Sequence, residues 1–522
     1  MAHADECRPA GGCCGCTAHA KGHGGGVSRR GFLGGLSTLA LAGCTLRGLS
    51  TGMVGATDDE VPPGPEREPL VVKPIFTYGT YKHRHQRSWR PWGGVETQED
   101  ADAEMARIRG ELEELAAQAD FPLTILPLSP ARHPNDLGKM SDLDQADTAL
   151  VYAAAGPSSI FSNLAAQGKD LIFFVRHRSG PVYLWYEIIH PRFLRSHSDQ
   201  LAQKGMDYQD VVVDSQDEVL WRLRALCGLK NAMGTGIVAV GGASGWSHAG
   251  RNAPQLARDH WKLDIQDLPY AELRKLLEAA RKDEQAVALA RRRAEAYLKD
   301  PSLSLETKKE FVERCFLLDQ VFRSVMAQAG ARAITVNACM GTIMPVSETT
   351  ACLTLTTLND DGWMAFCESD FVAIPTGILL SSISGLPPFL HNPTFPHDGI
   401  ITLAHCTAPR KMDGKALEPA RIVTHYESDY GAAPKVEFRK GQEVTIVNAD
   451  FAEQRWMGLR AEVADTPFLP ICRSQLDARV PVDDLELARE MRGFHWMMVY
   501  GDYRREVGYA LKKTGIAWKP LG

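Results

Sequence analysis

The sequence lacks the marks of several common protein classes. It has no block of like charge, and its net charge is only −6 over 522 residues, which does not favour nucleic-acid binding. No GxGxxG motif follows a predicted strand and no Walker motif is present, so nucleotide binding has no support. The apolar run at 33–42 is too short to span a bilayer as a mature helix.

Cysteine pairs with motif spacing are also missing. Of the twelve cysteines, five precede residue 45 and the other seven are scattered through apolar stretches. Such scattered cysteines are typical of buried thiols and do not indicate a disulfide framework. The short basic segment 82–90 (KHRHQRSWR) predicts either a solvated loop or a contact for an anion or a sugar.

The first 68 residues predict an export signal, an anchor and a tether. Ser28-Arg29-Arg30-Gly31-Phe32-Leu33 matches the twin-arginine pattern, and a mildly apolar run follows it. Leu41-Ala42-Gly43-Cys44 is similar to a lipobox, so Cys44 is a candidate for lipidation and membrane anchoring; a chance cysteine is the alternative. We therefore expect a periplasmic or membrane-anchored extracytoplasmic protein.

Two further segments lie around this signal. The leader before Arg29 is rich in Cys and His, which could bind a metal, but its spacing fits no closed zinc site and favours a disordered leader. Residues 45–68 are rich in Gly, Pro, Thr and acidic side chains, which is typical of a flexible tether.

Apolar runs and helical patterns alternate along the first two thirds of the body. Runs with strand character are expected at 70–76, 121–128, 148–154, 170–175, 210–214, 236–241, 261–265 and 333–338. Helical patterns are expected at 98–119, 216–227, 268–297 and 305–329. This alternation predicts parallel sheets with covered faces.

The last third changes to short runs rich in β-formers, separated by Gly, Pro and Asp turns. We therefore predict an α/β protein with two doubly wound, Rossmann- or flavodoxin-like domains at 69–205 and 206–385, followed by a β-rich, barrel-like domain at 386–522.

Three residues at the ends or edges of apolar runs suggest a metal site. Glu368 follows the run 363–367, His405 ends the run 400–404, and His495 lies in Gly493-Phe494-His495-Trp496. A carboxylate and two imidazoles can bind a divalent metal, although each histidine by itself is more often a structural residue.

From about residue 362 onward the sequence resembles the L-fucose isomerase and L-arabinose isomerase superfamily. Five short patches carry the resemblance, in the family's order and at similar separations: Cys367-Glu368-Ser369-Asp370, Ser384–Asn392, Leu403-Ala404-His405-Cys406, Lys440–Thr445 and Gly493–Gly501.

The resemblance implies a metal-dependent aldose–ketose isomerase. It implies Mn²⁺ or Mg²⁺ bound by Glu368, Asn392, His405 and His495, with Glu368 and the residue at Asn392 as the proton-transferring groups. It also implies a free sugar as substrate and a homo-oligomer, either a trimer or a hexamer.

Asn392 departs from the family pattern, in which an acid stands at this position. An amide oxygen can coordinate Mg²⁺ or Mn²⁺ but cannot exchange a proton near pH 7. Asp370 is expected to cap a helix or orient a ligand, whereas His391, Asp398 and Glu348 are candidates to replace the missing acid.

Three hypotheses remain open from the sequence. The first is an exported sugar isomerase, or an epimerase or dehydratase that uses the same enediolate. The second is a non-catalytic, membrane-tethered carbohydrate-binding protein on the isomerase fold. The third is a fold without a working site.

Overall fold

The structure is a computed structural model that describes residues 63–194, 208–246, 248–450 and 454–522. The twin-arginine pattern, the candidate lipidation site Cys44 and the Cys/His-rich leader lie outside the described residues. The described residues belong to one compact unit. In the part of the chain that is described, no helix combines the length and apolarity that crossing a membrane requires.

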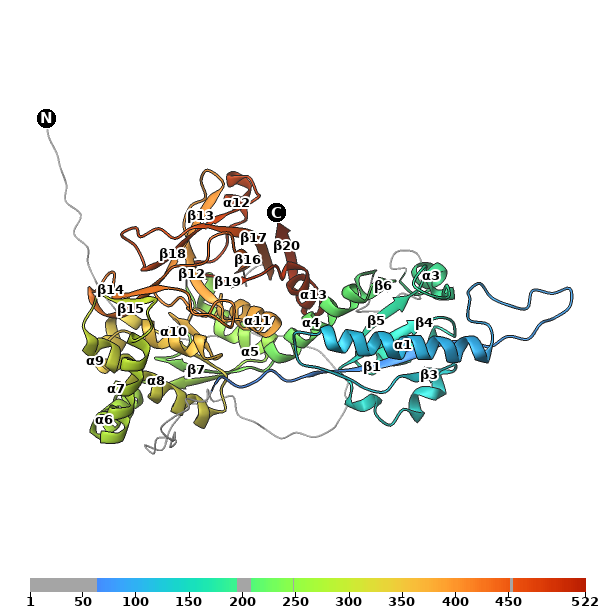
Figure 1. Cartoon of the computed structure of the whole chain (residues 1–522), viewed down its shortest axis with the longest axis horizontal. Coiled ribbons are helices and arrows are strands. Elements are labelled where there is room, and N and C mark those ends of the chain that lie inside the picture. The colour runs from blue at the N-terminus through green and yellow to red at the C-terminus, as the bar shows by residue number, and fades with distance from the viewer. Residues whose placement is uncertain (1–62, 195–207, 247, 451–453) are drawn as a thin grey trace, which may run out of the picture. The chain divides into compact units, whose positions relative to one another are not determined.

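The first sheet is parallel and has the order β2-β1-β4-β5-β6, with β3 also paired to β1 (Figure 1). Its strands are β1 (Leu70–Thr77), β2 (Leu123–Ile125), β3 (Ser129–Ala131), β4 (Thr148–Ala153), β5 (Asp170–Val175) and β6 (Val211–Val213). Helices α1 (Gln98–Gln118), α2 (Ser159–Ala166), α3 (Leu184–Ile189) and α4 (Gln216–Ala232) share its core. Every residue of β4 is buried, which explains its continuous apolar run.

The second sheet is also parallel, with the order β11-β10-β7-β8. Its strands are β7 (Gly236–Val240), β8 (Asp264–Leu268), β10 (Ala333–Val336) and β11 (Met364–Cys367). Ile237 and Ala239 belong to one hydrophobic core, and Val238 and Val240 to another. Because alternate residues of a strand point to opposite faces, both faces of this sheet are covered.

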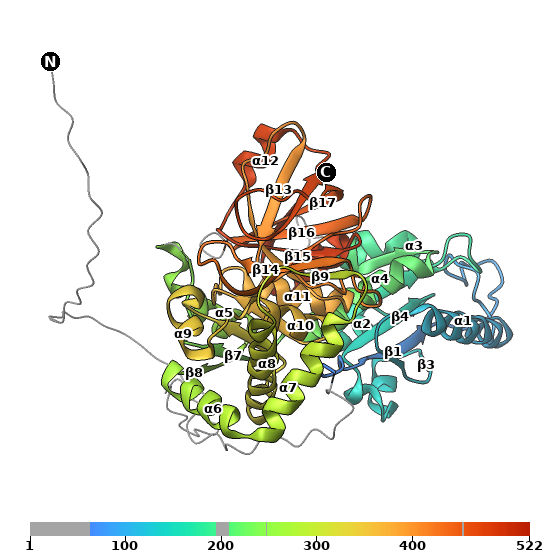
Figure 2. The same cartoon turned by 60° about the vertical axis from the view of Figure 1, so that its left-hand side comes forward.

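The helices of this region are α5 (Ala253–Trp261), α6 (Tyr270–Lys282), α7 (Glu284–Leu298), α8 (Lys309–Ala329), α9 (Met344–Ser347), α10 (Cys352–Asp360) and α11 (Ile374–Ser384). Helices α6, α7 and α8 pack together beside the second sheet (Figure 2). Helix α4 packs against α11 so closely that a Cβ atom on Gly228 would lie 2.2 Å from the Ile383 side chain.

Six antiparallel strands close into a barrel in the order β16-β19-β12-β13-β18-β17, because β17 also pairs with β16. They are β12 (Phe389–Pro393), β13 (Ile400–His405), β16 (Glu443–Asp450), β17 (Arg455–Asp465), β18 (Ser474–Arg479) and β19 (Trp496–Tyr500). Strand β20 (Ala517–Leu521) adds to β17, and helices α12 (Asp484–Glu490) and α13 (Arg504–Thr514) complete the region. The predicted fold class, two parallel α/β sheets followed by a β-barrel, is confirmed.

A small sheet of order β15-β14-β9 lies outside the barrel and contains β9 (Leu303–Leu305), β14 (Ala420–His425) and β15 (Tyr430–Val436). It joins two parts of the chain that are distant in sequence, because β9 precedes α8 whereas β14 follows β13.

Several element predictions were wrong in detail. The run 261–265 is not one strand, because Trp261 ends α5 and stacks on Trp456, and Lys262 adopts a left-handed conformation before β8 begins. The pattern at 268–297 forms two helices, since the Asp283 side chain caps the second of them. The strand at 211–213 does not open the second α/β region, because it pairs with β5 at the edge of the first sheet.

Candidate functional site

Glu368 lies directly after β11, at the carboxyl edge of the second sheet, where ligands bind in open α/β sheets. Glu368 and Ser369 have left-handed φ values of 62° and 51°, which are uncommon for residues other than glycine. The Ser369 N–H donates to Thr335 Oγ1 at 3.1 Å, and the Ser369 hydroxyl donates to the Gly242 carbonyl at 3.0 Å. This tight turn directs the Glu368 side chain away from its own strand.

Two histidines of the barrel approach the Glu368 carboxylate. His405 ends β13, and its Nε2 lies 3.8 Å from Glu368 Oε1. His495 precedes β19, and its Nε2 lies 3.4 Å from Glu368 Oε2. The two imidazole centroids are 5.9 Å apart. The three residues predicted from separate segments are therefore brought together. Two ligands of one ion lie ~3.0–3.6 Å apart for bonds of ~2.1 Å and angles of ~90–120°; the 3.4 Å spacing falls in this range and the 3.8 Å spacing slightly exceeds it.

Asp370 orients His495. The Nδ1 of His495 lies 2.9 Å from Asp370 Oδ2, while Asp370 Oδ1 accepts the backbone N–H groups of Trp246 and Val372. With Nδ1 directed at Asp370, the buried Nε2 of His495 faces the Glu368 carboxylate. A carboxylate that holds the far nitrogen of a histidine is the usual companion of a metal ligand.

The ionisation of these groups follows their surroundings. Burial would lower the pKa of His495, but its hydrogen bonds and the charges of Asp370 and Glu368 raise it to about 8. Burial lowers the pKa of His405 to about 4, so this imidazole is neutral near pH 7. Burial would raise the pKa of Glu368, but hydrogen bonding with His495 and the electrostatic interactions with His405 and His495 lower it.

Asn392 lines the same cavity as Glu368, a space of about 750 Å³. Asn392 lies on β12 and pairs with Ala404 of β13, the residue that precedes His405. Of the suggested replacement acids, Asp398 and Glu348 do not line this cavity; Asp398 is exposed, and Glu348 lies 3.6 Å from both Arg281 and Arg314. The prediction that either replaces the acid is not supported by their positions.

His391 lies near the site, but its contacts indicate a structural role. It is fully buried, and its Nδ1 is 3.0 Å from the Phe389 carbonyl. Burial lowers its pKa to about 3, which makes it a weak base.

Sequence reasoning did not assign Cys367 or Glu427 to the site. Cys367, Glu368 and His405 each offer an atom within 4.8 Å of the others, so this trio could hold a metal ion. The Cys367 thiol is a poor thiolate source, because its hydrogen bond with Cys339 and its burial raise its pKa. A carboxylate from Glu427, on the turn between β14 and β15, also lines the cavity. No motif marks Glu427, and only its tertiary position reveals it.

Aromatic side chains form part of the cavity wall. Trp246 and Phe494 stack with ring centroids 4.4 Å apart and an interplanar angle of 18°, and both are nearly half exposed. No Lys or Arg is among the described residues that line this cavity. The cavity therefore offers an apolar face, two carboxylates and an amide.

Comparison with known proteins adds little. No protein-family model matches the sequence, and no curated protein matches it. Among solved structures, the crystal structure of a sugar ABC transport system, substrate-binding protein, from Bordetella parapertussis 12822 is similar at 14% identity over 57% of this chain and 82% of that chain. Its TM-score is 0.14, and a likeness this weak supports no conclusion about fold or function.

Proposed function

We propose that the protein is a metal-dependent sugar isomerase-like enzyme that acts on a free aldose or ketose through an enediolate. The convergence of Glu368, His405 and His495, with Asp370 behind His495, carries the proposal. The donor set of carboxylate oxygens, imidazole nitrogens and the Asn392 amide fits a divalent ion such as Mn²⁺ or Mg²⁺. When bound, such an ion would act as a Lewis acid toward the carbonyl and hydroxyl oxygens of the sugar.

The reaction requires groups that move protons. A carboxylate takes the proton from C2 of the aldose, and the same proton or one from solvent returns to C1, while a second proton passes from the O2 hydroxyl to O1. Glu368 can serve as one base. Asn392 cannot serve as the other, so we assign the second role to Glu427, which lies in the same cavity.

The cavity wall indicates the kind of sugar. The stacked pair of Trp246 and Phe494 suits the apolar face of a sugar ring, and a volume of about 750 Å³ accommodates a small carbohydrate. Because the described residues of the wall include carboxylates and no cationic side chain, we expect an uncharged sugar.

Isomerisation in D₂O tests the proposal. The full chain is loaded with Mn²⁺ and incubated with aldoses and ketoses, and deuterium at C1 and C2 is followed by NMR. We expect exchange together with conversion. Exchange without conversion would point to a half-competent site. The absence of both exchange and conversion would contradict catalysis. Asn392→Asp is the companion variant, which we expect to bind Mn²⁺ more tightly because it adds a negative charge.

A non-catalytic, carbohydrate-binding protein is the second candidate, and the amide at Asn392 favours it. This candidate predicts sugar binding that depends on Mn²⁺ without proton exchange. Export by the twin-arginine route, anchoring through Cys44 and assembly into a trimer or hexamer stay predictions. Mass spectrometry of the mature N-terminus and light scattering after size-exclusion chromatography test them.

A further inference from the structure

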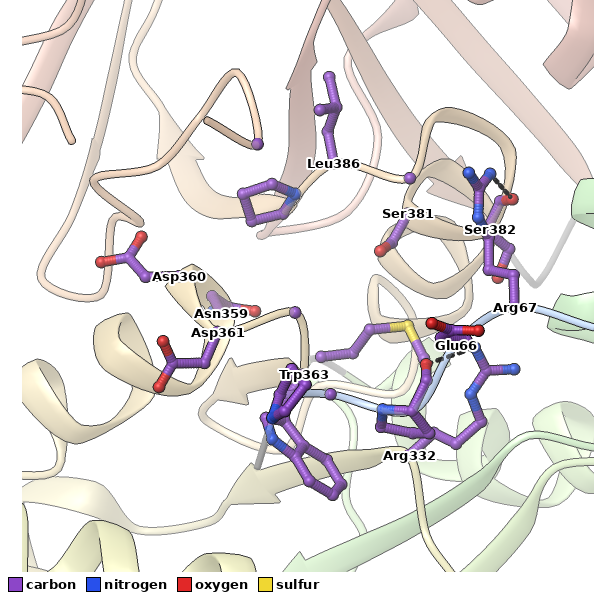
Figure 3. A pocket seen from close by; sticks show the side chains of 18 of the residues that line it. Glu66, Arg67, Arg332, Asn359, Asp360, Asp361, Trp363, Ser381, Ser382 and Leu386 are labelled. Atoms are coloured by element: carbon purple, nitrogen blue, oxygen red, sulfur yellow. Dashed lines mark hydrogen bonds between the residues drawn. The ribbon is translucent and has the colours of Figure 1, made fainter. Parts of the chain in front are cut away.

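A second cavity, of about 590 Å³, lies away from the candidate metal site (Figure 3). Its wall combines the segment 63–67, the residues 359–364 that run from the end of α10 to the start of β11, and the C-terminal end of α11. The two cavities have no lining residue in common. Whatever binds here is therefore separate from the proposed isomerase chemistry.

Two guanidinium groups face this cavity without a carboxylate partner. Among the described residues, Arg67 donates through Nη1 alone, to the carbonyls of Ser382 and Ile383 at the end of α11. Arg332 donates to Asn231 Oδ1 at 3.2 Å and to the Pro65 carbonyl at 3.3 Å, and its buried Nε has no partner. Within the described residues, no carboxylate oxygen lies within 4.0 Å of a nitrogen of either side chain.

Neither guanidinium group is therefore held in an ion pair among the described residues, although the exposed Glu66 also lines this end of the cavity (Figure 3). Burial has the largest effect on Arg332 and lowers its pKa; of the nearby charges, Glu68 raises this pKa and Arg67 lowers it. Both groups nevertheless remain protonated, because an arginine does not lose its proton in a protein. Guanidinium groups with free N–H donors bind an oxyanion through paired hydrogen bonds.

The other end of the cavity holds an unpaired acceptor. Asp360 Oδ1 accepts the backbone N–H groups of Arg410 and Lys411, both at 2.7 Å, but the buried Oδ2 has no partner. Asp360 is only 8% exposed, and burial raises its pKa to about 7. An orphan polar atom at this depth costs free energy unless a ligand or water satisfies it. Figure 3 shows Asp360 across the cavity from Arg67 and Arg332.

We propose that this cavity binds a small phosphate monoester, with the phosphate at Arg67 and Arg332 and a hydroxyl group donating to Asp360 Oδ2. Lys411, which also lines the cavity, supplies a third cation. Asp361 does not cancel these charges, because its carboxylate is paired with Arg323 at 2.6 Å. The indole N–H of Trp363 is buried without a partner and offers a further donor.

Titration calorimetry with the full chain tests this assignment. Glucose 6-phosphate, inorganic phosphate and glucose are compared at matched ionic strength. We expect glucose 6-phosphate to bind more tightly than inorganic phosphate, because only the ester reaches Asp360. Glucose, which lacks the phosphate, should not compete with it. Absence of phosphate binding at millimolar concentrations would overturn the proposal.

Variants locate the binding. Arg332→Met and Lys411→Met should weaken binding of both phosphates by about tenfold or more, the effect expected when a charged hydrogen-bond partner is lost. Asp360→Asn should weaken glucose 6-phosphate but not inorganic phosphate, because the amide still accepts the two backbone N–H groups. Lys415→Met, four residues from Lys411 and outside the cavity wall, is the matched control.

Two outcomes would overturn the assignment. Equal affinity in the wild type and in both cation variants would overturn the assignment. If Arg332→Met fails to fold, Lys411→Met and Asp360→Asn still decide it. A Glu368→Gln variant should bind glucose 6-phosphate as the wild type does, and a loss there would show that the phosphate binds at the metal cavity instead.

Discussion

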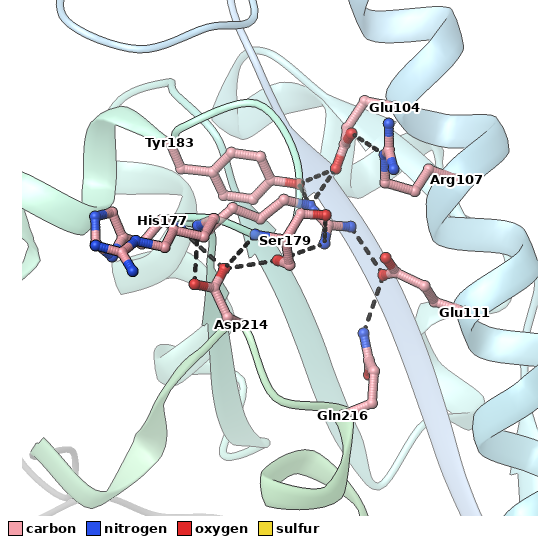
Figure 4. Close-up of polar contacts among 10 residues, drawn as sticks. Glu104, Arg107, Glu111, His177, Ser179, Tyr183, Asp214 and Gln216 are labelled. Atoms are coloured by element: carbon pink, nitrogen blue, oxygen red, sulfur yellow. Dashed lines mark hydrogen bonds and ion pairs between the residues drawn. The ribbon is translucent and has the colours of Figure 1, made fainter.

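Asp214 fixes the carboxyl edge of the first sheet (Figure 4). Its carboxylate accepts the backbone N–H groups of His177, Arg178 and Ser179 and the Ser179 hydroxyl, at 2.6–3.1 Å. Burial would raise the pKa of Asp214, but these hydrogen bonds lower it to about 2. The ends of β5 and β6 are thereby joined through one ionised side chain.

Asp214→Asn tests this role. We expect a loss of about 1–2 kcal/mol in the free energy of unfolding at pH 7, because the charge-assisted bonds are lost. Since the folded pKa lies below the unfolded value of ~3.9, the contribution is complete above about pH 4 and disappears as the pH falls toward 2. The gap between wild type and variant in urea titrations should shrink over that range; a constant gap would contradict the account.

Arg176 forms the second part of this network. It is fully buried and lies 2.8 Å from Glu111 Oε2 and 2.5 Å from Glu104 Oε1, and Glu104 also accepts the Tyr183 hydroxyl at 2.6 Å. Figure 4 shows Glu104, Glu111 and Tyr183 meeting between α1 and the strands. Every charge in the group has a partner, so the network stabilises the fold and needs no ligand.

Glu427 carries the residue-scale prediction about catalysis. If it is the second proton-transferring group, Glu427→Gln should lower kcat by about 10²–10⁴-fold and leave Mn²⁺ affinity unchanged. Glu462→Gln, on the exposed face of β17, is the control. Unchanged turnover in Glu427→Gln would assign the proton transfer to another group, and a loss of metal affinity would make Glu427 a ligand.

At the scale of elements, α4 and α11 meet at a position that only glycine fits. A Cβ atom at residue 228 would lie 2.8 Å from the Ile383 Cα, and backbone atoms cannot easily move aside. Gly228→Ala should therefore destabilise the protein by about 1–3 kcal/mol through overpacking.

Gly110 is the matched control. It lies inside α1, and a Cβ atom there would meet nothing within 4 Å. Gly110→Ala should stabilise the protein by about 0.5–1 kcal/mol, because alanine has the better helix propensity. Thermal unfolding of both variants measures the two effects. A loss of stability in Gly110→Ala would contradict the prediction that helix propensity determines the effect of alanine at this position.

The elements that were predicted show an amphipathic pattern or a clear run of β-formers, whereas those that were missed do not. The pattern 98–119 is amphipathic and begins after Thr97, whose side chain caps the helix, so α1 could be found from sequence. Helices α10 and α11 are almost wholly buried, so they show no polar face and no helical period. Strand β18 was also missed, since its sequence SQLDAR contains few β-formers.

At the scale of the whole molecule, the candidate metal site joins the second sheet to the barrel. Glu368 follows a sheet strand, whereas His405 and His495 flank barrel strands. An ion bound to all three residues would stabilise the folded state of both the second sheet and the barrel. Mn²⁺ at 100 times its Kd should therefore stabilise the protein by about 2.7 kcal/mol.

Thermal unfolding with and without Mn²⁺ measures this linkage. Glu368→Gln should abolish the rise in Tm, because the variant loses the charged ligand between the two imidazoles. An equal rise in the variant would place the ion elsewhere, for example at surface carboxylates.

The sequence by itself determined the order of the elements and the fold class, because burial on parallel sheets requires continuous apolar runs and amphipathic helices show their period locally. It also placed Glu368 at the end of a strand. Only the tertiary structure decided which groups face that carboxylate. His495 and Asp370, which are 125 residues apart, meet where the barrel packs against the second sheet, and no local pattern encodes such a contact. Glu427 and the pair of Arg67 and Arg332 became visible for the same reason, since a site depends on distances between segments that the chain separates.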